Sequence, residues 1–197
     1  MSRSASRQRT TRETDIAISI DLDGPTGTVE ASTGLPFFDH MLDQLGRHGG
    51  FDLSVQATGD LHVDGHHTVE DTGILLGEAF AEAMGDKAGV RRFASGLYPL
   101  DEALIEVALD LSGRPFLAYD VPFGEVLPLG DPPFNPEMAE HFWQSFATAA
   151  GITLHVRKKA GTNTHHVVEA TFKGVARCLR DAVRVEGTGV PSTKGSL

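Results

Sequence analysis

The sequence holds a single cysteine, Cys178, among its 197 residues, so no disulfide can form within the chain. Such sparing use of thiols is typical of a reducing compartment, and we expect the protein to be cytoplasmic. No apolar run approaches the roughly 20 residues that a membrane-spanning helix needs. The basic, polar start at residues 1–9 has no apolar segment behind it, which argues against a secretory signal and predicts a disordered leader.

Positive charge is also scarce, because 17 lysines and arginines face 27 acidic residues and the formal net charge is −10 at pH 7. This balance argues against a nucleic-acid partner and against a membrane surface. It still allows a few basic side chains to hold a small anion. The chain lacks a glycine-rich phosphate loop, and it lacks the His-Glu-x-x-His pattern of zinc peptidases.

Histidine is abundant, and six of the nine histidines belong to a motif that occurs twice. Residues 66–70 read His-His-Thr-Val-Glu, and residues 165–169 read His-His-Val-Val-Glu. A further histidine precedes each copy, His40 by 26 residues and His141 by 24. A lone histidine is more often a surface or core residue, but the repetition indicates an internal duplication that carries ligands for divalent metals. The eight candidate ligands are His40, His66, His67, Glu70, His141, His165, His166 and Glu169.

Helix geometry suggests how these ligands group. At a helix start, residues three or four apart share a face, whereas neighbours diverge by about 100°. We therefore expect His67 and Glu70 to bind one metal while His66 points toward another. The second copy is expected to repeat this grouping, with Glu169 beside His166. Adjacent histidines that diverge can serve two metals or bridge two subunits.

Hydrophobic periodicity predicts strands and two helices in each half of the chain. Helices are expected over residues 36–47, 68–84, 136–150 and from the second His-His motif to about residue 183. Strands are expected over residues 11–20, 28–31, 51–58, 100–110, 116–121 and 152–158. Each half thus reads strand, strand, helix, strand, helix, which predicts an α+β fold with helices on one face of each sheet. The proline-rich segment 122–136 is expected to be a surface connection.

Several long segments of the chain resemble the imidazoleglycerol-phosphate dehydratase family of histidine biosynthesis. The matching segments are residues 37–45, 64–71, 99–104, 110–115, 140–146, 163–173 and 191–195. The resemblance implies two ferredoxin-like, or ribosomal S5 domain 2-like, halves at about residues 10–95 and 96–190. Both halves would belong to a single catalytic domain, residues 10–197, which ends in a phosphate-binding tail.

The family resemblance also implies the reaction. D-erythro-1-(imidazol-4-yl)glycerol 3-phosphate would lose water to give 3-(imidazol-4-yl)-2-oxopropyl phosphate, with two Mn²⁺ ions in each active site. The chemistry agrees, because a carbanion formed beside an alcohol needs an acceptor, and an imidazole held by a Lewis acid on each nitrogen provides one. The expected assembly is a homo-oligomer of 24 subunits with active sites shared between subunits.

The resemblance implies roles for particular residues as well. The metal ligands would be the eight side chains named above. The substrate-binding residues would be Glu13, Arg92, Arg114, Lys173, Ser192, Thr193 and Lys194. The residues for proton transfer and hydroxyl orientation would be Glu13, Gln44, Asp101 and Glu169. Guanidinium, ammonium and hydroxyl donors together suit a terminal phosphate.

Two other functions remain open from the residues alone. A di-metal hydrolase could act on a phosphorylated substrate through a metal-bound hydroxide. A non-catalytic metal-binding shell protein could use the histidines only to join subunits. The dehydratase is distinguished by forming a ketone without releasing inorganic phosphate.

Overall fold

The structure is a computed structural model that describes residues 3–24, 26–124 and 127–195. Its elements form two halves of identical order. The first half contains β1 (Ser4–Thr10), β2 (Thr14–Asp21), β3 (Val29–Ser32), α1 (Pro36–Gly49), β4 (Asp52–Gly59) and α2 (His66–Met84). The second half contains β5 (Phe93–Leu100), β6 (Ala103–Asp110), β7 (Phe116–Asp120), α3 (Met138–Ala150), β8 (Thr153–Ala160) and α4 (Thr164–Ala182). The predicted α+β duplication is confirmed.

Each half builds a mixed four-stranded sheet, in the orders β1-β2-β4-β3 and β5-β6-β8-β7. In both sheets the last pair, β3 with β4 or β7 with β8, is parallel and the others are antiparallel. Ile20 of β2 lies opposite Leu53, and Leu109 of β6 lies opposite Leu154. The two sheets therefore share their register over most of these strands; the exception is a one-residue shift of β8 against β6 between Leu104 and Ile105.

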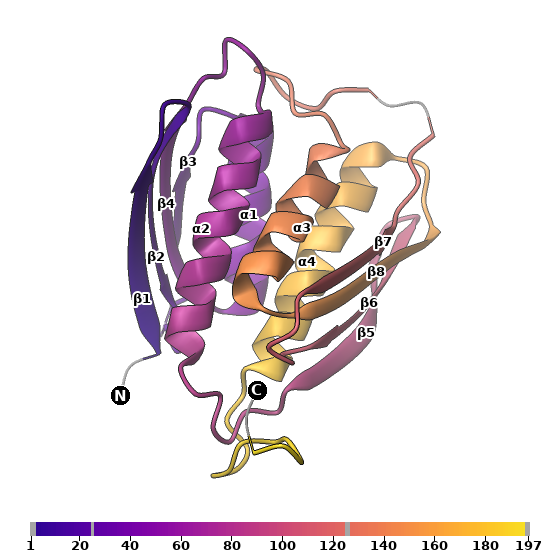
Figure 1. Cartoon of the computed structure of the whole chain (residues 1–197). Coiled ribbons are helices and arrows are strands. Elements are labelled where there is room, and N and C mark those ends of the chain that lie inside the picture. The colour runs from indigo at the N-terminus through magenta and orange to yellow at the C-terminus, as the bar shows by residue number, and fades with distance from the viewer. Residues whose placement is uncertain (1–2, 25, 125–126, 196–197) are drawn as a thin grey trace.

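Figure 1 shows the two sheets on the outside and the four helices between them. Helix α2 packs on β1 and β2, α4 packs on β5 and β6, and the halves meet where α2 contacts α3 and α1 contacts α4. Aromatic side chains fill this middle layer: Phe38, Phe142, Trp143 and Phe172 are fully buried. Among the described residues, no helix has the length and apolar content needed to cross a membrane.

The disordered leader expected over residues 1–9 is corrected by the structure wherever it is described. Strand β1 pairs with β2 along its whole length, with Ala5 opposite Ile20. Arg9 also holds the strand against α2, since its Nη1 lies 2.9 Å from an oxygen of Asp71. Backbone pairing stabilises a strand whose side chains are mostly polar, and apolar periodicity does not reveal such a strand. Residues 1 and 2 lie outside the described residues.

Three further expectations need correction. The expected strand over residues 100–110 begins only at Ala103, because Asp101, with a φ of +48°, and Glu102 turn the chain from β5 into β6. Because β5 begins at Phe93, the second half starts earlier than residue 96. The proline-rich segment is not purely a surface connection, since Phe134 is fully buried with its ring 5.3 Å from that of Phe37. Residues 125 and 126 of this segment lie outside the described residues.

Two glycines of α2 allow α3 to approach closely. A Cβ on Gly77 would lie 2.7 Å from the carbonyl oxygen of Phe146, and a Cβ on Gly73 would lie 2.8 Å from that of Phe142. Both distances are shorter than ordinary contacts allow. The first turn of α2 and that of α3 each carry a candidate metal ligand, so this close approach sets the spacing between those ligands.

We expect Gly77→Ala to destabilise the protein by about 1–3 kcal/mol through overpacking against α3. Alanine improves helix propensity by only about 1 kcal/mol, so the net effect remains a lower melting temperature, measured by calorimetry. Gly124→Ala serves as the control, because a Cβ there meets nothing within 4 Å. Equal melting temperatures for Gly77→Ala and the control would contradict the close-packing argument.

Candidate metal centre and phosphate pocket

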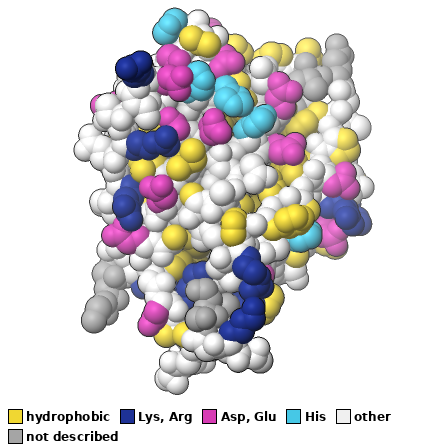
Figure 2. Space-filling model, in the orientation of Figure 1, with side chains coloured by type: hydrophobic (Ala, Val, Ile, Leu, Met, Phe, Trp, Pro, Cys, Tyr) yellow, Lys and Arg dark blue, Asp and Glu magenta, His cyan; other side chains and the backbone are white. Residues whose placement is uncertain are grey.

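The two His-His motifs open α2 and α4, and polar side chains define where these helices begin. Asn163 caps α4 by accepting the amides of His165 at 3.0 Å and His166 at 3.4 Å. Asp64 accepts the amide of His66 at 2.8 Å. Figure 2 shows histidine side chains gathered beside acidic ones at one end of the molecule.

His40, His165 and Glu169 form the tighter of two clusters. Their ligand atoms all lie within 4.8 Å of one another. Oε2 of Glu169 lies 2.9 Å from Nε2 of His165 and 3.3 Å from Nε2 of His40. Two imidazoles and a carboxylate are a donor set that fits a divalent first-row metal. The cluster joins both halves, because α1 supplies His40 and α4 supplies the other two residues.

His66, Glu70 and His141 form the corresponding cluster. Nε2 of His66 lies 3.8 Å from Oε2 of Glu70, and the rings of His66 and His141 have centroids 4.7 Å apart. Here α2 of the first half supplies two residues and α3 of the second half supplies His141. The duplication therefore yields two clusters that each take residues from both halves.

The expected pairing of Glu70 with His67 is wrong, and so is its counterpart in α4. The residue four positions earlier comes close instead, so that Glu70 faces His66 and Glu169 faces His165. Four residues along a helix leave two side chains only about 40° apart, against about 60° for three residues. The second histidine of each motif consequently makes other contacts.

A carboxylate holds that second histidine in each half. Nδ1 of His67 lies 3.0 Å from Oδ2 of Asp60, and Nδ1 of His166 lies 2.7 Å from Oε2 of Glu102. These bonds raise the pKa of His67 and that of His166. The bond from His166, helped by the amide of Asn163, lowers the pKa of Glu102 to about 2. The sequence analysis did not identify either carboxylate as a partner of a histidine. Both residues lie at the end of a predicted strand near a histidine-bearing helix, and this position could have indicated the contact.

Two predicted catalytic carboxylates lie near the same histidines. Oε2 of Glu13 is 3.9 Å from Nδ1 of His67, and Oδ2 of Asp101 is 3.8 Å from Nε2 of His166. Their side chains are 54% and 75% exposed, so both can reach a ligand bound there. The positive φ of Asp101 is costly for a residue with a side chain, and such strain concentrates at functional sites.

Gln44, the other predicted orienting residue, is buried beside His40. Its Nε2 lies 3.4 Å from Nδ1 of His40 and 3.3 Å from Oδ2 of Asp43. At this position its amide helps to hold the His40 ring, one helical turn earlier on α1.

Lys173 pairs with Glu169 one turn further along α4, with Nζ 2.5 Å from Oε1. Burial opposes the ionisation of Glu169, but hydrogen bonds from Lys173 and His165 outweigh it and lower its pKa to about 2. Glu169 is therefore ionised near neutral pH, in the form that binds metal. This contact also places Lys173 at the histidine end, apart from the other residues predicted to hold the phosphate.

Those other residues meet in a single pocket of about 540 Å³. The pocket is lined by Arg92, Arg114, Pro191, Ser192, Thr193 and Lys194. Arg92 is fixed there because its Nε donates to Asp110 at 2.6 Å and its Nη1 donates to the carbonyl of Pro191 at 2.6 Å. The predicted phosphate-binding tail thus comes together with both predicted arginines.

The pocket and the histidine clusters lie at opposite ends of the same strand. Asp110 ends β6 beside Arg92, whereas Glu102 directly precedes β6 beside His166. Eight residues of strand span about 25 Å, which exceeds the length of an imidazole joined to a phosphate by three carbons. Figure 1 shows the same separation, with the C-terminal segment at the far end of α4 from its histidine motif.

A family model described as imidazoleglycerol-phosphate dehydratase matches residues 33–179. The chain belongs to the imidazoleglycerol-phosphate dehydratase family. The imidazoleglycerol-phosphate dehydratase of Acidothermus cellulolyticus is 56% identical over 196 residues, which cover 99% of this chain and 93% of the relative. That of Methanopyrus kandleri is 50% identical over 195 residues, covering 99% of this chain and 96% of the relative.

Solved imidazoleglycerol-phosphate dehydratases share the fold. The enzyme from Staphylococcus aureus superposes with a TM-score of 0.81 at 34% identity, covering 91% of this chain and 97% of the other. The enzyme from Pyrococcus furiosus superposes with a TM-score of 0.78 at 35% identity, covering 97% of this chain and 100% of the other. These comparisons confirm the family resemblance and the duplicated α+β architecture.

The pairing of Lys173 with Glu169 makes a prediction about acid stability. Because the pKa of Glu169 is lowered from 4.5 to about 2, its ionisation stabilises the metal-free fold above pH 4.5, and this stabilisation is lost as pH falls toward 2. Lys173→Met removes a major cause of that shift. The variant should therefore show a smaller fall in melting temperature on acidification in EDTA than the wild type shows. Lys159→Met, which removes an exposed pair with Glu106, is the control; indistinguishable curves for Lys173→Met and wild type would disprove the coupling.

Proposed function

We infer that this chain is a carbon–oxygen hydro-lyase of histidine biosynthesis, which dehydrates D-erythro-1-(imidazol-4-yl)glycerol 3-phosphate to 3-(imidazol-4-yl)-2-oxopropyl phosphate. The observation that carries the inference is similarity to imidazoleglycerol-phosphate dehydratases along essentially the whole chain. The histidine clusters and the basic pocket supply groups suited to the two ends of this substrate. The single buried cysteine fits a cytoplasmic enzyme.

Two Mn²⁺ ions in each active site complete the proposal. Support comes from the two clusters, each of which offers two imidazoles and a carboxylate. His67 and His166 are the remaining proposed ligands, and their rings lie outside the clusters of their own chain. When bound, the two ions supply Lewis acidity at the imidazole ring of the substrate.

The protein's own side chains then divide the remaining tasks. Glu13 and Asp101 transfer protons or orient hydroxyls, since both are exposed carboxylates beside the histidines. Glu169 serves as a metal ligand, in keeping with its low pKa, and Gln44 positions His40. The phosphate group is bound by Arg92, Arg114, Ser192, Thr193 and Lys194, with Lys173 approaching from the histidine end.

We also propose a homo-oligomer of 24 subunits with active sites shared between subunits, and the separation of the two ends supports the sharing. A substrate much shorter than about 25 Å cannot reach both the histidine clusters and the phosphate pocket of one chain. In the proposed assembly, the pocket of one subunit faces the histidines of another. His67 and His166, about a third exposed at their side chains, are then available to a neighbouring copy.

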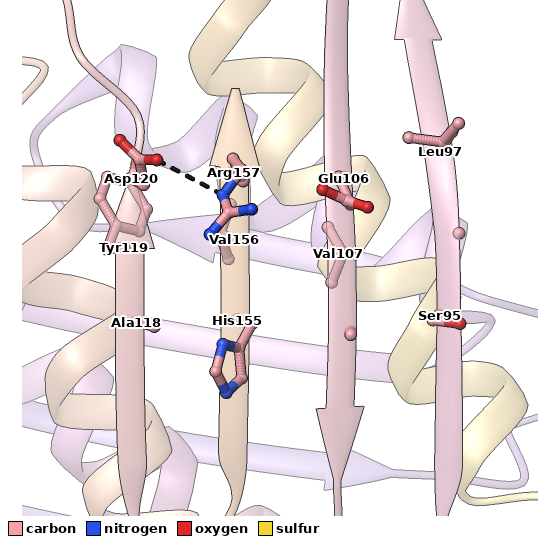
Figure 3. A pocket seen from close by; sticks show the side chains of 12 residues that line it. Ser95, Leu97, Glu106, Val107, Ala118, Tyr119, Asp120, His155, Val156 and Arg157 are labelled. Atoms are coloured by element: carbon pink, nitrogen blue, oxygen red, sulfur yellow. Dashed lines mark ion pairs between the residues drawn. The ribbon is translucent and has the colours of Figure 1, made fainter. Parts of the chain in front are cut away.

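The outer face of the second sheet also supports assembly. Ser4 and Gln8 of β1 occupy the positions that Phe93 and Leu97 occupy in β5, where both side chains are more than half exposed. Figure 3 shows Leu97 on this face together with Glu106 and with the ion pair between Arg157 and Asp120. An apolar surface bordered by both signs of charge is typical of a protein interface.

Purified protein loaded with Mn²⁺ should convert the imidazole-glycerol phosphate to its ketone, measured by enolate absorbance, without releasing inorganic phosphate. EDTA should abolish this activity and reduce the particle size seen by size-exclusion chromatography, because the proposed ligands are divided between subunits. Restoring Mn²⁺ should reverse both effects. Phosphate release without ketone would instead support the di-metal hydrolase, and neither product would support the non-catalytic shell protein.

Shared active sites predict complementation between two defective variants. Arg114→Ala should raise KM about 10- to 100-fold through loss of a charged hydrogen bond to phosphate, and His165→Ala should lower metal loading. Particles reassembled from a mixture should regain activity above either variant alone, because some sites combine an intact pocket with intact histidines. A mixture of Arg114→Ala with Lys194→Ala, both altered in the same pocket, should show no recovery. Failure of the first mixture would place the whole site within one chain.

A further inference from the structure

The second histidine of each motif is held through its Nδ1 atom, but the two halves take the holding carboxylate from different places. Asp60 is the first residue after β4, and its two oxygens lie 3.2 and 3.0 Å from Nδ1 of His67. Glu102 is the last residue before β6, and its Oε2 lies 2.7 Å from Nδ1 of His166. The two halves thus make the same contact to the histidine ring with carboxylates from different positions of the repeat.

The register of the sheets identifies the counterpart of each carboxylate. Glu13 directly precedes β2, as Glu102 directly precedes β6. Asp60 directly follows β4. In the second half the register of β6 against β8 shifts by one residue between Leu104 and Ile105, so the counterpart of Asp60 is Thr162. The first half therefore carries carboxylates at both positions, while the second half carries one at the position before its strand alone.

We propose that Asp60 and Glu102 are positioning residues: Asp60 orients His67 and Glu102 orients His166, so that Nε2 of each ring can bind metal. In the first half Asp60 makes the contact to the histidine ring that Glu102 makes in the second half, so Glu13, the counterpart of Glu102, does not need to make it. The inference rests on the proposed metal-binding function. It adds two residues to the support of the site and gives a physical reason why Glu13 is free to act on substrate.

The reason lies in the hydrogen-bonding capacity of imidazole. An ionised carboxylate only accepts hydrogen bonds, so Nδ1 of each ring must carry the hydrogen that it donates to Asp60 or Glu102. In the neutral ring the lone pair is then on Nε2, the atom left to bind a metal. A fixed carboxylate also restrains rotation of the ring, which lowers the entropy lost when the ligand set closes.

The second half has no carboxylate at the position of Asp60, because Thr162 stands there. Glu102 must serve instead, and its other oxygen accepts the amides of Thr162 at 3.3 Å and Asn163 at 2.9 Å. Both of its oxygens are committed to holding the protein.

Glu13 is in the opposite situation. Its Oε2 lies 3.9 Å from Nδ1 of His67, beyond hydrogen-bond distance, because Asp60 already occupies that position on the ring. Its side chain is 54% exposed. A carboxylate held near the site but not bound to the ring can exchange protons with a bound molecule.

The test measures Mn²⁺ affinity by competition with a fluorescent chelator, alongside particle size and melting temperature. Asp60→Ala should weaken Mn²⁺ binding about 10- to 100-fold. Asp60→Asn keeps an oxygen that can accept the Nδ1 hydrogen, and should recover most of the affinity. Asp60→Ser, whose hydroxyl does not reach the ring, gives a second removal variant should Asp60→Ala fold poorly. Asp15→Ala, on the outer face of the same sheet, controls for the loss of one negative charge.

Glu13→Gln tests the division of labour. Glu13→Gln should lower kcat and leave Mn²⁺ affinity at the wild-type value. Glu102→Gln should weaken Mn²⁺ binding, because its one amide oxygen cannot accept hydrogen bonds from both the His166 ring and the loop amides. Wild-type affinity in both Asp60→Ala and Asp60→Ser would overturn the inference, as would a loss of affinity in Glu13→Gln equal to that in Asp60→Ala. Absence of Mn²⁺ binding by the wild type would overturn the proposed metal function and this inference together.

Discussion

Contact between helices of opposite halves is the constraint on which the site depends. Neither half can form a cluster alone, because His40 of α1 must meet Glu169 of α4 and His141 of α3 must meet Glu70 of α2. The glycines of α2 allow the close approach of α3, and buried aromatic rings fill the layer between the two halves. The helices are packed between the two sheets by burial of apolar side chains, and this packing determines where the polar ligand atoms lie. A fold of this kind couples its stability directly to ligand geometry.

The duplication and the identity of the ligands could be predicted from sequence because they repeat as a local pattern. The grouping of the ligands could not, because the choice between His66 and His67 as the partner of Glu70 depends on about 20° of helical rotation and on what else each ring meets. In this structure His67 contacts Asp60, a residue outside the motif. Strand β1 escaped prediction for a related reason: its stability comes from backbone pairing with β2 and contacts such as that of Arg9 with Asp71, which leave little apolar periodicity.

The distance between the two ends of β6 has consequences beyond one subunit. A pocket built on Arg92 and Arg114 is useful only if a second chain brings histidines to it, so assembly becomes a condition of activity under the proposed function. Metal ligands that lie outside their own chain's clusters would then stabilise the assembly and complete the site at once. Polar and exposed ligand side chains in an isolated chain are, in that case, interface residues in the assembled particle.

Divergence between matching halves separates what the fold requires from what the chemistry requires. Positions where both halves agree, such as the histidines opening α2 and α4, serve the common need for ligands. Positions where they differ mark specialised tasks: Phe93 and Leu97 stand where β1 has the polar residues Ser4 and Gln8, and Thr162 stands where Asp60 holds a ring. Glu13 and Glu102 differ in the same way. Under the inference above, Glu13 can act on substrate because Asp60 makes the contact to the histidine ring, whereas Glu102 must make that contact itself.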